Sequence, residues 1–230
     1  GEENMKEIVS LMDYRSSIKV IDATLRDGGL VNDFYFTDEF VRALYEANIR
    51  AGVDYMEMGY KSSKEMFDEN KYGKWKFCDD DDIREIVGDN DTNLKIAVMA
   101  DVGRCDYRKD IVSRSESPID LIRVATYLNT IPAAADMIED AKRKGYEVSC
   151  NIMAISNGQE SDLKVALDIL GKTSADVLYI VDSFGSLYPE QIARIADTYM
   201  EFASKYGKKL GIHAHNNQQL AFANTIEAVG

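Results

Sequence analysis

The chain has 230 residues, of which 45% are hydrophobic and 29% charged, and its formal net charge is -13 at pH 7. This composition predicts one globular domain and excludes a disordered or fibrous chain. The acidic balance excludes a protein that tracks nucleic-acid phosphates, which would need a basic face. No apolar run approaches the ~20 residues that span a bilayer, so we expect no membrane partner.

The cysteine pattern favours a reducing compartment. Cys78, Cys105 and Cys150 are odd in number and far apart. Their spacing predicts neither a disulfide framework nor a thiolate metal site, and a cytoplasmic location fits it best. Residues 1–4 precede the first methionine. We interpret them as the product of processing or trimming.

The main domain is expected to begin with a strand after an N-terminal extension over residues 1–17. Residues 18–23 predict that strand, and residues 24–29 predict a polar, glycine-rich turn. Thr37 is the expected N-cap of a helix that is stopped by Gly52. Strand, loop and helix thus follow one another from the start.

The second predicted strand, residues 53–60, carries an acid that needs an explanation, because alternation faces Glu57 away from Met56 and Met58. Residues 61–82 follow without a regular period. They form either a binding loop or a loop that its own aromatic side chains fix in place. A short helix is expected over residues 83–87.

Five further apolar segments bring the predicted strands to seven: residues 94–100, 121–127, 146–152, 177–181 and 210–215. Helices are expected between and after the later ones, at residues 132–144, 161–170, 189–206 and 218–229. Repeated parallel β/α units of this number predict a TIM (β/α)8-type barrel over residues 18–230.

The last predicted helix ends where an eighth strand would begin. We therefore interpret the chain as the front portion of a longer protein, truncated after about seven β/α units. The alternatives are a distorted barrel, or a gap that a partner subunit or another segment covers. Unpaired sheet edges favour association, so a homo-oligomer is also expected.

Polar residues fall at or just beyond the carboxyl ends of the predicted strands, and a barrel brings those ends to one rim. They are Arg26, Asp27, Glu57, Asp101, Thr126, Asn151, Asp182, Ser183, His213 and His215.

His213 and His215 are the only histidines, and two residues apart in a strand they share one face. Such a pair can bind one divalent cation, or it can be satisfied by ordinary hydrogen bonds. In a barrel, Asp27 lies across the place of the eighth strand and can reach the same lumen. Two imidazoles and a carboxylate suit a catalytic Mn²⁺, Mg²⁺, Zn²⁺, Co²⁺ or Fe²⁺.

Arg26, next to that carboxylate, could hold a substrate carboxylate or stabilise a developing enolate. Glu57 on the neighbouring strand could pair with Arg26 and fix its orientation. The alternative interpretation of Glu57 is a salt bridge in the lumen with no catalytic part.

Four motifs, in this order, resemble the DRE-TIM metallolyase superfamily of HMGL-like proteins, and the resemblance runs from residue 18 to the C-terminus. They are Thr24-Leu25-Arg26-Asp27-Gly28, Glu57 within MEMGY, Asp182-Ser183-Phe184-Gly185-Ser186, and His213-Ala214-His215-Asn216-Asn217. The resemblance implies a TIM barrel that forms or cleaves a carbon–carbon bond beside a 2-oxo or thioester carbonyl. It also implies a divalent metal, Mn²⁺ or Mg²⁺ ahead of Zn²⁺ or Co²⁺.

Residue by residue, the resemblance implies Asp27, His213 and His215 as metal ligands and Arg26 and Glu57 as catalytic residues. The expected substrate contacts are Asp182 and Ser183. Asn151, Thr126 and Asp101 are also expected to contact the substrate, because they lie on the same rim. Asn216 and Asn217 are expected to support the metal ligands.

The details are similar to 4-hydroxy-2-oxovalerate aldolases, which act on a small 2-oxo acid, with one departure. In those enzymes a histidine that acts as base follows the arginine-aspartate-glycine run by two residues, and here that position is Leu30. The base is therefore expected to be a tyrosine, a carboxylate, Cys105, metal-bound water or a group beyond Gly230. A Claisen-type synthase that uses an acyl-CoA, like isopropylmalate synthase, and a non-catalytic metal-binding barrel stay open.

Overall fold

Seven parallel strands form one sheet in the computed structural model, which describes residues 19–153, 160–182 and 189–214. Each strand pairs with the next one in the chain, in the order β1-β2-β3-β4-β5-β6-β7. The strands are β1 (Ile21–Asp22), β2 (Tyr55–Tyr60), β3 (Lys95–Asp101), β4 (Leu121–Thr126), β5 (Glu147–Met153), β6 (Val177–Asp182) and β7 (Lys209–Ala214). The predicted seven strands are confirmed.

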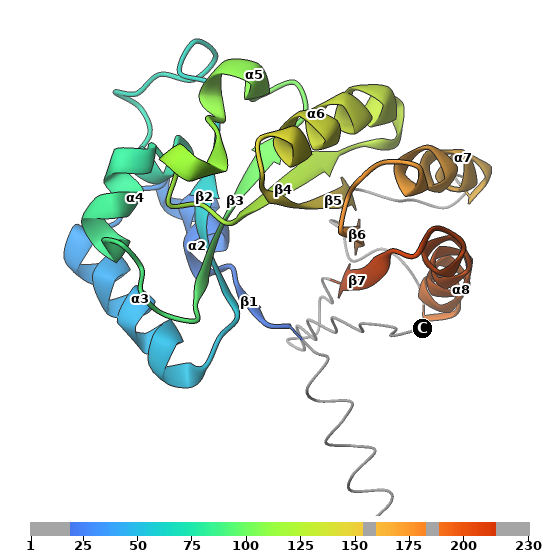
Figure 1. Ribbon diagram of the computed structural model, residues 1–230, viewed down its shortest axis with the longest axis horizontal. Helices are drawn as coiled ribbons and strands as arrows, with labels where there is room; N and C mark the ends of the chain where they lie inside the picture. Colours follow the sequence, from blue (N-terminus) through green and yellow to red (C-terminus); the bar gives the residue numbers. More distant parts are fainter. Residues whose placement is uncertain (1–18, 154–159, 183–188, 215–230) are drawn as a thin grey trace, which may run out of the picture.

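The sheet is curled (Figure 1). The helices are α2 (Thr24–Asn32), α3 (Asp38–Ala51), α4 (Asp80–Val87), α5 (Tyr107–Asp110), α6 (Ile131–Arg143), α7 (Glu160–Gly171) and α8 (Pro189–Tyr206), with the 3-10 helices η1 (Lys74–Lys76), η2 (Arg114–Glu116) and η3 (Leu128–Thr130). Helices α3, α4, α6, α7 and α8 lie on the outer side of the sheet (Figure 1). Parallel strands with outer helices are the arrangement of a TIM-type barrel, here over seven β/α units. The predicted fold class is confirmed.

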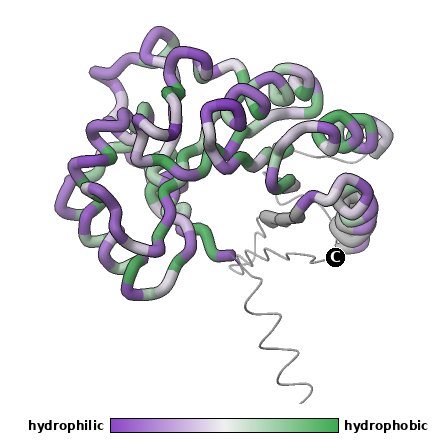
Figure 2. Tube along the Cα trace, in the orientation of Figure 1, coloured by the Kyte–Doolittle hydropathy of each residue, from purple (hydrophilic) through white to green (hydrophobic). Residues whose placement is uncertain are grey.

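The hydrophobic core lies between the sheet and the helices. Hydrophobic stretches follow the strands, whereas hydrophilic residues dominate the outer loops (Figure 2). Side chains with no exposed surface come from the outward face of the strands and from the helices that cover it: Met56, Ile96, Val98, Ile122, Val124, Val148, Cys150, Ile152, Val41, Ile138 and Leu167. Their burial drives the packing of helix on strand, because apolar area is removed from water.

Helix α3 begins and ends as predicted. Thr37 Oγ1 accepts a hydrogen bond of 3.1 Å from the backbone N–H of Phe40, which satisfies one of the free donors of the first turn. Gly52 closes the helix with φ of 70°, a left-handed conformation that glycine adopts without strain.

The prediction of a turn at residues 24–29 is wrong, because these residues begin the nine-residue helix α2. The two glycines that suggested a turn serve close packing instead. A Cβ on Gly29 would lie 2.1 Å from the ring of Phe34, and a Cβ on Gly28 would lie 3.2 Å from the ring of Phe36. With Leu25 fully buried beneath it, α2 is held firmly against the molecule.

The loop after β2 is fixed in place by its aromatic side chains, which was one of the two interpretations of residues 61–82. Trp75 and Phe77 are buried, and the rings of Phe67 and Tyr72 meet edge to face, with 5.9 Å between their centroids. The loop also contains η1, and α4 begins at Asp80, three residues earlier than predicted. The 3-10 helix η1 was not predicted, because its three residues are too few to give a helical period in the sequence.

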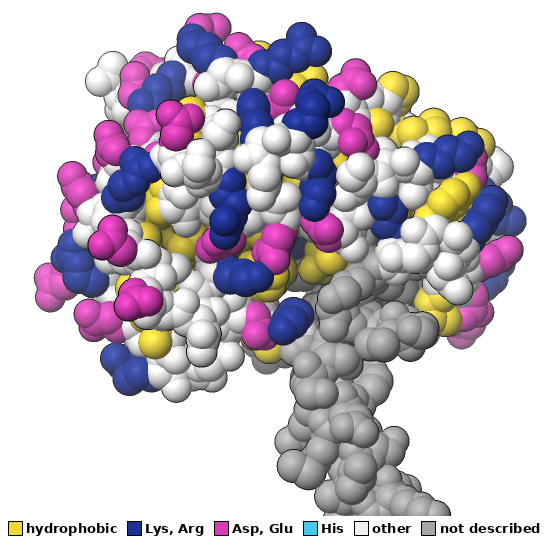
Figure 3. Space-filling model, viewed as in Figure 1, with side chains coloured by type: hydrophobic (Ala, Val, Ile, Leu, Met, Phe, Trp, Pro, Cys, Tyr) yellow, Lys and Arg dark blue, Asp and Glu magenta, His cyan; other side chains and the backbone are white. Residues whose placement is uncertain are grey.

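The visible face in Figure 3 carries Lys and Arg side chains interspersed with Asp and Glu. None of the described helices is long and apolar enough to cross a membrane. The predicted extension over residues 1–17 and the predicted helix over residues 218–229 lie outside the described residues.

Candidate active site

A cluster of three buried charges lies inside the curled sheet. Glu57 of β2 has no exposed surface and stands between Arg26 of α2 and Arg123 of β4. Arg26 Nε lies 2.8 Å from Glu57 Oε1 as an ion pair, although the angle is not that of a hydrogen bond. Arg123 Nη1 donates to Glu57 Oε2. The predicted pairing of Arg26 with Glu57 is confirmed, while its catalytic meaning stays a prediction.

This cluster keeps Arg26 charged and oriented. Burial acts to lower the pKa of the Arg26 guanidinium, but Glu57, together with Tyr60 and Asp27, raises that pKa above its ordinary value. Arg26 Nη1 also lies 3.2 Å from the sulfur of Met99 on β3. A guanidinium fixed on several sides presents a rigid fork of N–H donors, as recognition of a planar anion requires.

Arg123 is a member of the cluster that the sequence analysis missed. Its side chain is buried, and its guanidinium lies 5.4 Å from the ring centroid of Tyr179 on β6. Its Nε has no hydrogen-bond partner among the residues that the structure describes. A signal was present, because Arg123 interrupts the apolar strand LIRVAT just as Glu57 interrupts YMEMGY. Two opposite charges inside apolar strands that are one strand apart in a barrel are compatible with a partnership in the lumen.

Asp27 follows Arg26 on α2, and its side chain is 53% exposed. Its Oδ1 accepts a hydrogen bond of 3.2 Å from Arg26 Nη2. Among the described residues, Oδ2 has no polar partner. One oxygen held and the other open toward solvent is an arrangement that fits a carboxylate ligand of a divalent cation.

The backbone of β7 brings His213 to the carboxyl end of the sheet, where its Cα partner is Val181. Four other predicted site residues lie outside the described residues: Ser183, His215, Asn216 and Asn217. Their predicted roles, and that of Asp182 at the end of β6, stay predictions.

Two predicted rim residues, Asn151 and Asp101, lie in one register on strands that are separated by β4. Asn151 of β5 pairs with Ala125 of β4, which pairs with Asp101 of β3. Asn151 is buried, and among the described residues its Oδ1 has no hydrogen-bond partner. The same holds for Ser149 Oγ, two residues earlier on β5. Buried polar atoms without partners inside a barrel suit a site that binds a polar molecule.

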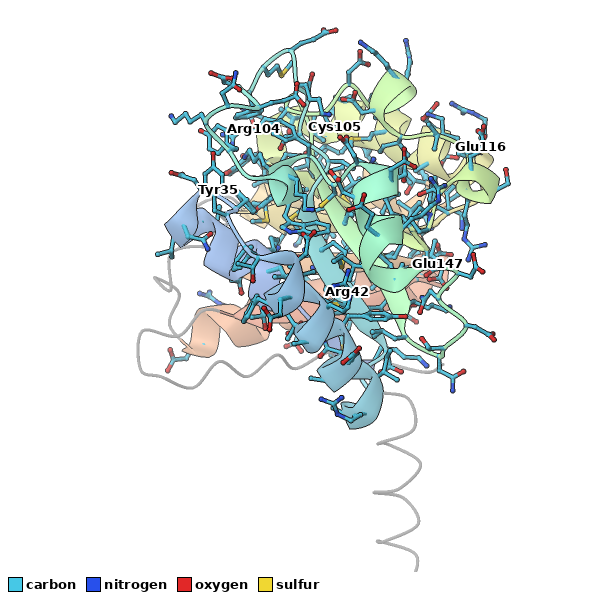
Figure 4. All side chains as sticks on the ribbon, turned by 90° about the vertical axis from the view of Figure 1, so that its left-hand side faces the viewer. Tyr35, Arg42, Arg104, Cys105, Glu116 and Glu147 are labelled. Carbon is cyan, nitrogen blue, oxygen red and sulfur yellow. The ribbon has the colours of Figure 1, made fainter. Side chains whose placement is uncertain are left out.

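Asp101 lies at the carboxyl end of β3, and its Oδ2 is 4.0 Å from Arg104 Nη1. Burial raises the pKa of its carboxyl, while Arg104, Lys76 and Arg26 lower it, and the net shift is upward. In Figure 4, Arg104 and Cys105 lie on the same side of the molecule as Tyr35, which follows α2, and away from Glu147 at the start of β5. Asp101, at the carboxyl end of β3 and near Arg104, therefore belongs to the rim that carries α2 and Arg26.

Thr126 is placed differently from the other rim residues. Its Oγ1 lies 2.7 Å from Thr130 Oγ1 and 3.1 Å from the carbonyl oxygen of Tyr127, so it ties β4 to η3. Alternation along β4 sets it on the face opposite to Arg123 and Ala125. The structure therefore does not bring Thr126 to the charge cluster, and its substrate contact stays a prediction.

Comparison with known proteins identifies the family. The HMGL-like family model matches residues 17–230. The chain belongs to the HMGL-like family. It is 29% identical over 210 residues to a 4-hydroxy-2-oxovalerate aldolase of Thermus thermophilus and 26% identical over 215 residues to one of Geobacillus genomosp. 3. These matches cover 91% and 94% of this chain but 59% and 62% of the relatives, so the chain spans about three fifths of their length.

A solved structure agrees with this assignment. The N-terminal domain of a proposed aldolase from Bacteroides vulgatus matches with a TM-score of 0.67 and 27% identity, over 91% of this chain and 68% of that chain. The resemblance that the motifs suggested is therefore confirmed at the level of the family.

In this HMGL-like chain, the position of the expected base lies beside the cluster but carries no titratable group. Leu30 is 64% exposed and lies three residues after Asp27 on α2, on the same side of the helix. Two titratable groups of the rim lie close to Arg26. Asp101 has a raised pKa, and burial raises the pKa of Tyr60 to about 12, an effect that Arg26 opposes.

Cys105 had been a further possibility for the base. Its thiol is buried, and burial raises its pKa to about 12. A thiol of that pKa is almost wholly protonated near neutral pH and is a poor base there. The same objection applies to Tyr60, whose pKa is also raised to about 12, so Asp101 is the favoured base among these three groups.

Proposed function

We propose that the protein is a divalent-metal-dependent aldolase or lyase that acts on a 2-oxo acid, in a retro-aldol reaction of the 4-hydroxy-2-oxo acid type. The observation that carries the proposal is the Arg26–Glu57–Arg123 cluster beside the half-open carboxylate of Asp27. It supplies a fixed cation and a metal-ligand oxygen at one point of the rim. The names of the relatives support the same reaction class.

Asp27, His213 and His215 would hold the cation. When bound, a divalent cation supplies Lewis acidity that polarises the carbonyl group of the substrate. Arg26 binds the anionic end of the substrate and donates hydrogen bonds to the oxygen on which negative charge develops. Glu57 and Arg123 hold that guanidinium in place. Asn151 orients the substrate with its Oδ1, which lacks a hydrogen-bond partner in the described part of the chain.

Proton transfer falls to a group of the rim. As the hydroxyl proton leaves, the carbon–carbon bond breaks, an aldehyde departs, and the electron pair of the bond forms the enolate, which is then protonated to the 2-oxo acid product. Asp101 is suited to take the hydroxyl proton, because a carboxylate with a raised pKa is a stronger base than an ordinary one.

The test uses the full chain loaded with Mn²⁺ and offered 4-hydroxy-2-oxovalerate, with pyruvate measured by a coupled dehydrogenase. Metal content is measured separately by elemental analysis. We expect one cation per chain, lost in His213→Ala, and pyruvate release that Arg26→Lys reduces by about 10²-fold or more. Unchanged metal binding in His213→Ala would refute the ligand assignment. Thiol release from acetyl-CoA with a 2-oxo acid, in place of pyruvate release, would assign the Claisen-type alternative.

A further inference from the structure

Lys76 lies in a cage of aromatic rings. Its Nζ is 4.3 Å from the ring centroid of Phe67, 5.1 Å from that of Tyr60, 5.3 Å from that of Tyr72 and 5.4 Å from that of Phe34. We call these four side chains the aromatic cage. Each ring face attracts a cation through its quadrupole, so the cage stabilises the ammonium form of the lysine.

The cage is built rigidly. Lys76 ends η1, where its backbone N–H bonds to the Gly73 carbonyl, and its own carbonyl accepts from Ser62. A Cβ on Gly73 would lie 2.0 Å from the carbonyl oxygen of Phe34, and one on Gly59 would lie 2.1 Å from that of Trp75. Both glycines thus allow η1 to approach α2 and β2 closely.

Within the part of the chain that the structure describes, Lys76 makes no ion pair, and the residue is 8% exposed. Burial lowers the pKa of its ammonium, with Asp101 raising it and Arg104 lowering it. Burying a charge without a counter-charge costs free energy. Residues that bear this cost concentrate at functional sites.

The cage adjoins the candidate active site through Tyr60. Tyr60 ends β2, its ring meets Phe34 edge to face at 5.6 Å, and its pKa responds to Arg26 and to Asp101. The Lys76 ammonium therefore stands on the rim, separated from Arg26 by one aromatic ring. Two cations so arranged can engage the two ends of one small anion.

We infer that Lys76 is an anion-recognition residue of the candidate active site, and that the 2-oxo acid bound there carries a second anionic group, a carboxylate or a phosphoryl group, which Lys76 binds. The inference rests on the proposed function, because Arg26 and the cation take the 2-oxo carboxylate end. The aromatic cage keeps the ammonium in place and leaves its N–H donors for the ligand.

The test compares two ligands of equal chain length. 2-Oxoglutarate and 2-oxopentanoate differ only in a terminal carboxylate against a terminal methyl group. Their binding to the Mn²⁺-loaded full chain is measured by calorimetry. We expect 2-oxoglutarate to bind about ten-fold or more tightly, the effect of one charged hydrogen bond. 3-Phosphonopyruvate forms the phosphoryl arm, and the tighter of the two dianions identifies the second group.

Lys76→Met retains the apolar stem and removes the ammonium. It should abolish the preference for the dianion and leave the affinity for 2-oxopentanoate unchanged. Lys71→Met is the matched control, because Lys71 is exposed and lies 5.3 Å over the ring of Tyr72 alone. This variant removes an equal charge from the outer side of one cage residue and should keep the preference.

Acylation mapped by peptide mass spectrometry gives a second measurement, in which 2-oxoglutarate but not 2-oxopentanoate should protect Lys76. A wild-type chain that does not distinguish the two ligands, or a Lys76→Met variant that retains the preference while only its melting temperature falls, would overturn the inference. Elemental analysis of the same samples reports on the metal independently. A chain that binds Mn²⁺ without preferring the dianion thus contradicts this inference alone.

Discussion

Replacement of Glu57 by glutamine should destabilise the protein strongly, because it leaves two buried guanidinium groups facing each other without their shared anion. Glu57 has no exposed surface, and the side chains of Arg26 and Arg123 are 9% and 6% exposed. Breaking one buried ion pair by removing a partner costs about 3–5 kcal/mol. Against a total stability of about 5–15 kcal/mol, this is a large fraction.

Urea unfolding and thermal unfolding, both followed by tryptophan fluorescence, measure the effect. Trp75 is the only tryptophan and is fully buried, so its emission reports on the core. The melting temperature of Glu57→Gln should fall by roughly 6–20 °C for a chain of this size. Glu65→Gln serves as the control, because Glu65 and its partner Lys109 are 72% and 67% exposed and such pairs contribute about 1 kcal/mol or less.

A second variant tests the cause. Removing one of the two cations as well, in Glu57→Gln with Arg123→Met, should recover part of the lost stability, since fewer charges remain uncompensated. The reasoning fails if Glu57→Gln costs less than about 1 kcal/mol, the range of exposed pairs. It fails equally if the free energy of unfolding of the double variant is lower than that of Glu57→Gln, because removing a cation should then have restored stability.

Three further predictions concern other parts of the molecule. Gly29→Ala should cost about 1–3 kcal/mol and weaken Mn²⁺ binding, because the added Cβ meets the ring of Phe34 and displaces the helix that carries Asp27; Gly52→Ala, where the added Cβ meets nothing, should cost about 1 kcal/mol in chemical unfolding and leave Mn²⁺ binding intact. The three thiols should react slowly with an aromatic disulfide at pH 8 and fully after denaturation, since burial raises the pKa of Cys105 and Cys150 to about 12 and that of Cys78 further; fast reaction of the native protein would contradict their burial. Tyr60, whose pKa is about 12 in the fold against 10.0 when unperturbed, retains its proton in the native state while the unfolded chain loses it, so stability should fall between pH 10 and 12; Tyr60→Phe should show a smaller fall in urea titrations across that window, and an equal fall would show that the tyrosine is not the cause.

The repeating architecture could be predicted from the sequence because its signals are local. Apolar segments separated by capped helices define the strands, and Thr37 with Gly52 marks both ends of α3. The helix over residues 24–32 could not be predicted, since two glycines normally indicate a turn and their packing against Phe34 and Phe36 is a tertiary fact.

The candidate site was predictable in part for the same reason. The pairing of Arg26 and Glu57 follows from the order of neighbouring strands, so it could be anticipated. Arg123 is two strands from Glu57, and the aromatic cage around Lys76 assembles side chains from the segment after α2, from β2 and from the loop after β2. Such contacts depend on the curvature of the sheet, which no short segment of sequence specifies.

The position of Glu57 gives it an architectural consequence beyond its neighbours. It joins groups from α2 and β4, which are not hydrogen-bonded to each other, and so spans β3 like a chord across an arc. Because this link has a fixed length, it limits how far β2 and β4 can move apart and so how far the sheet can flatten between them. The rim loops can therefore differ in sequence to accept new ligands while the local curvature of the sheet is kept.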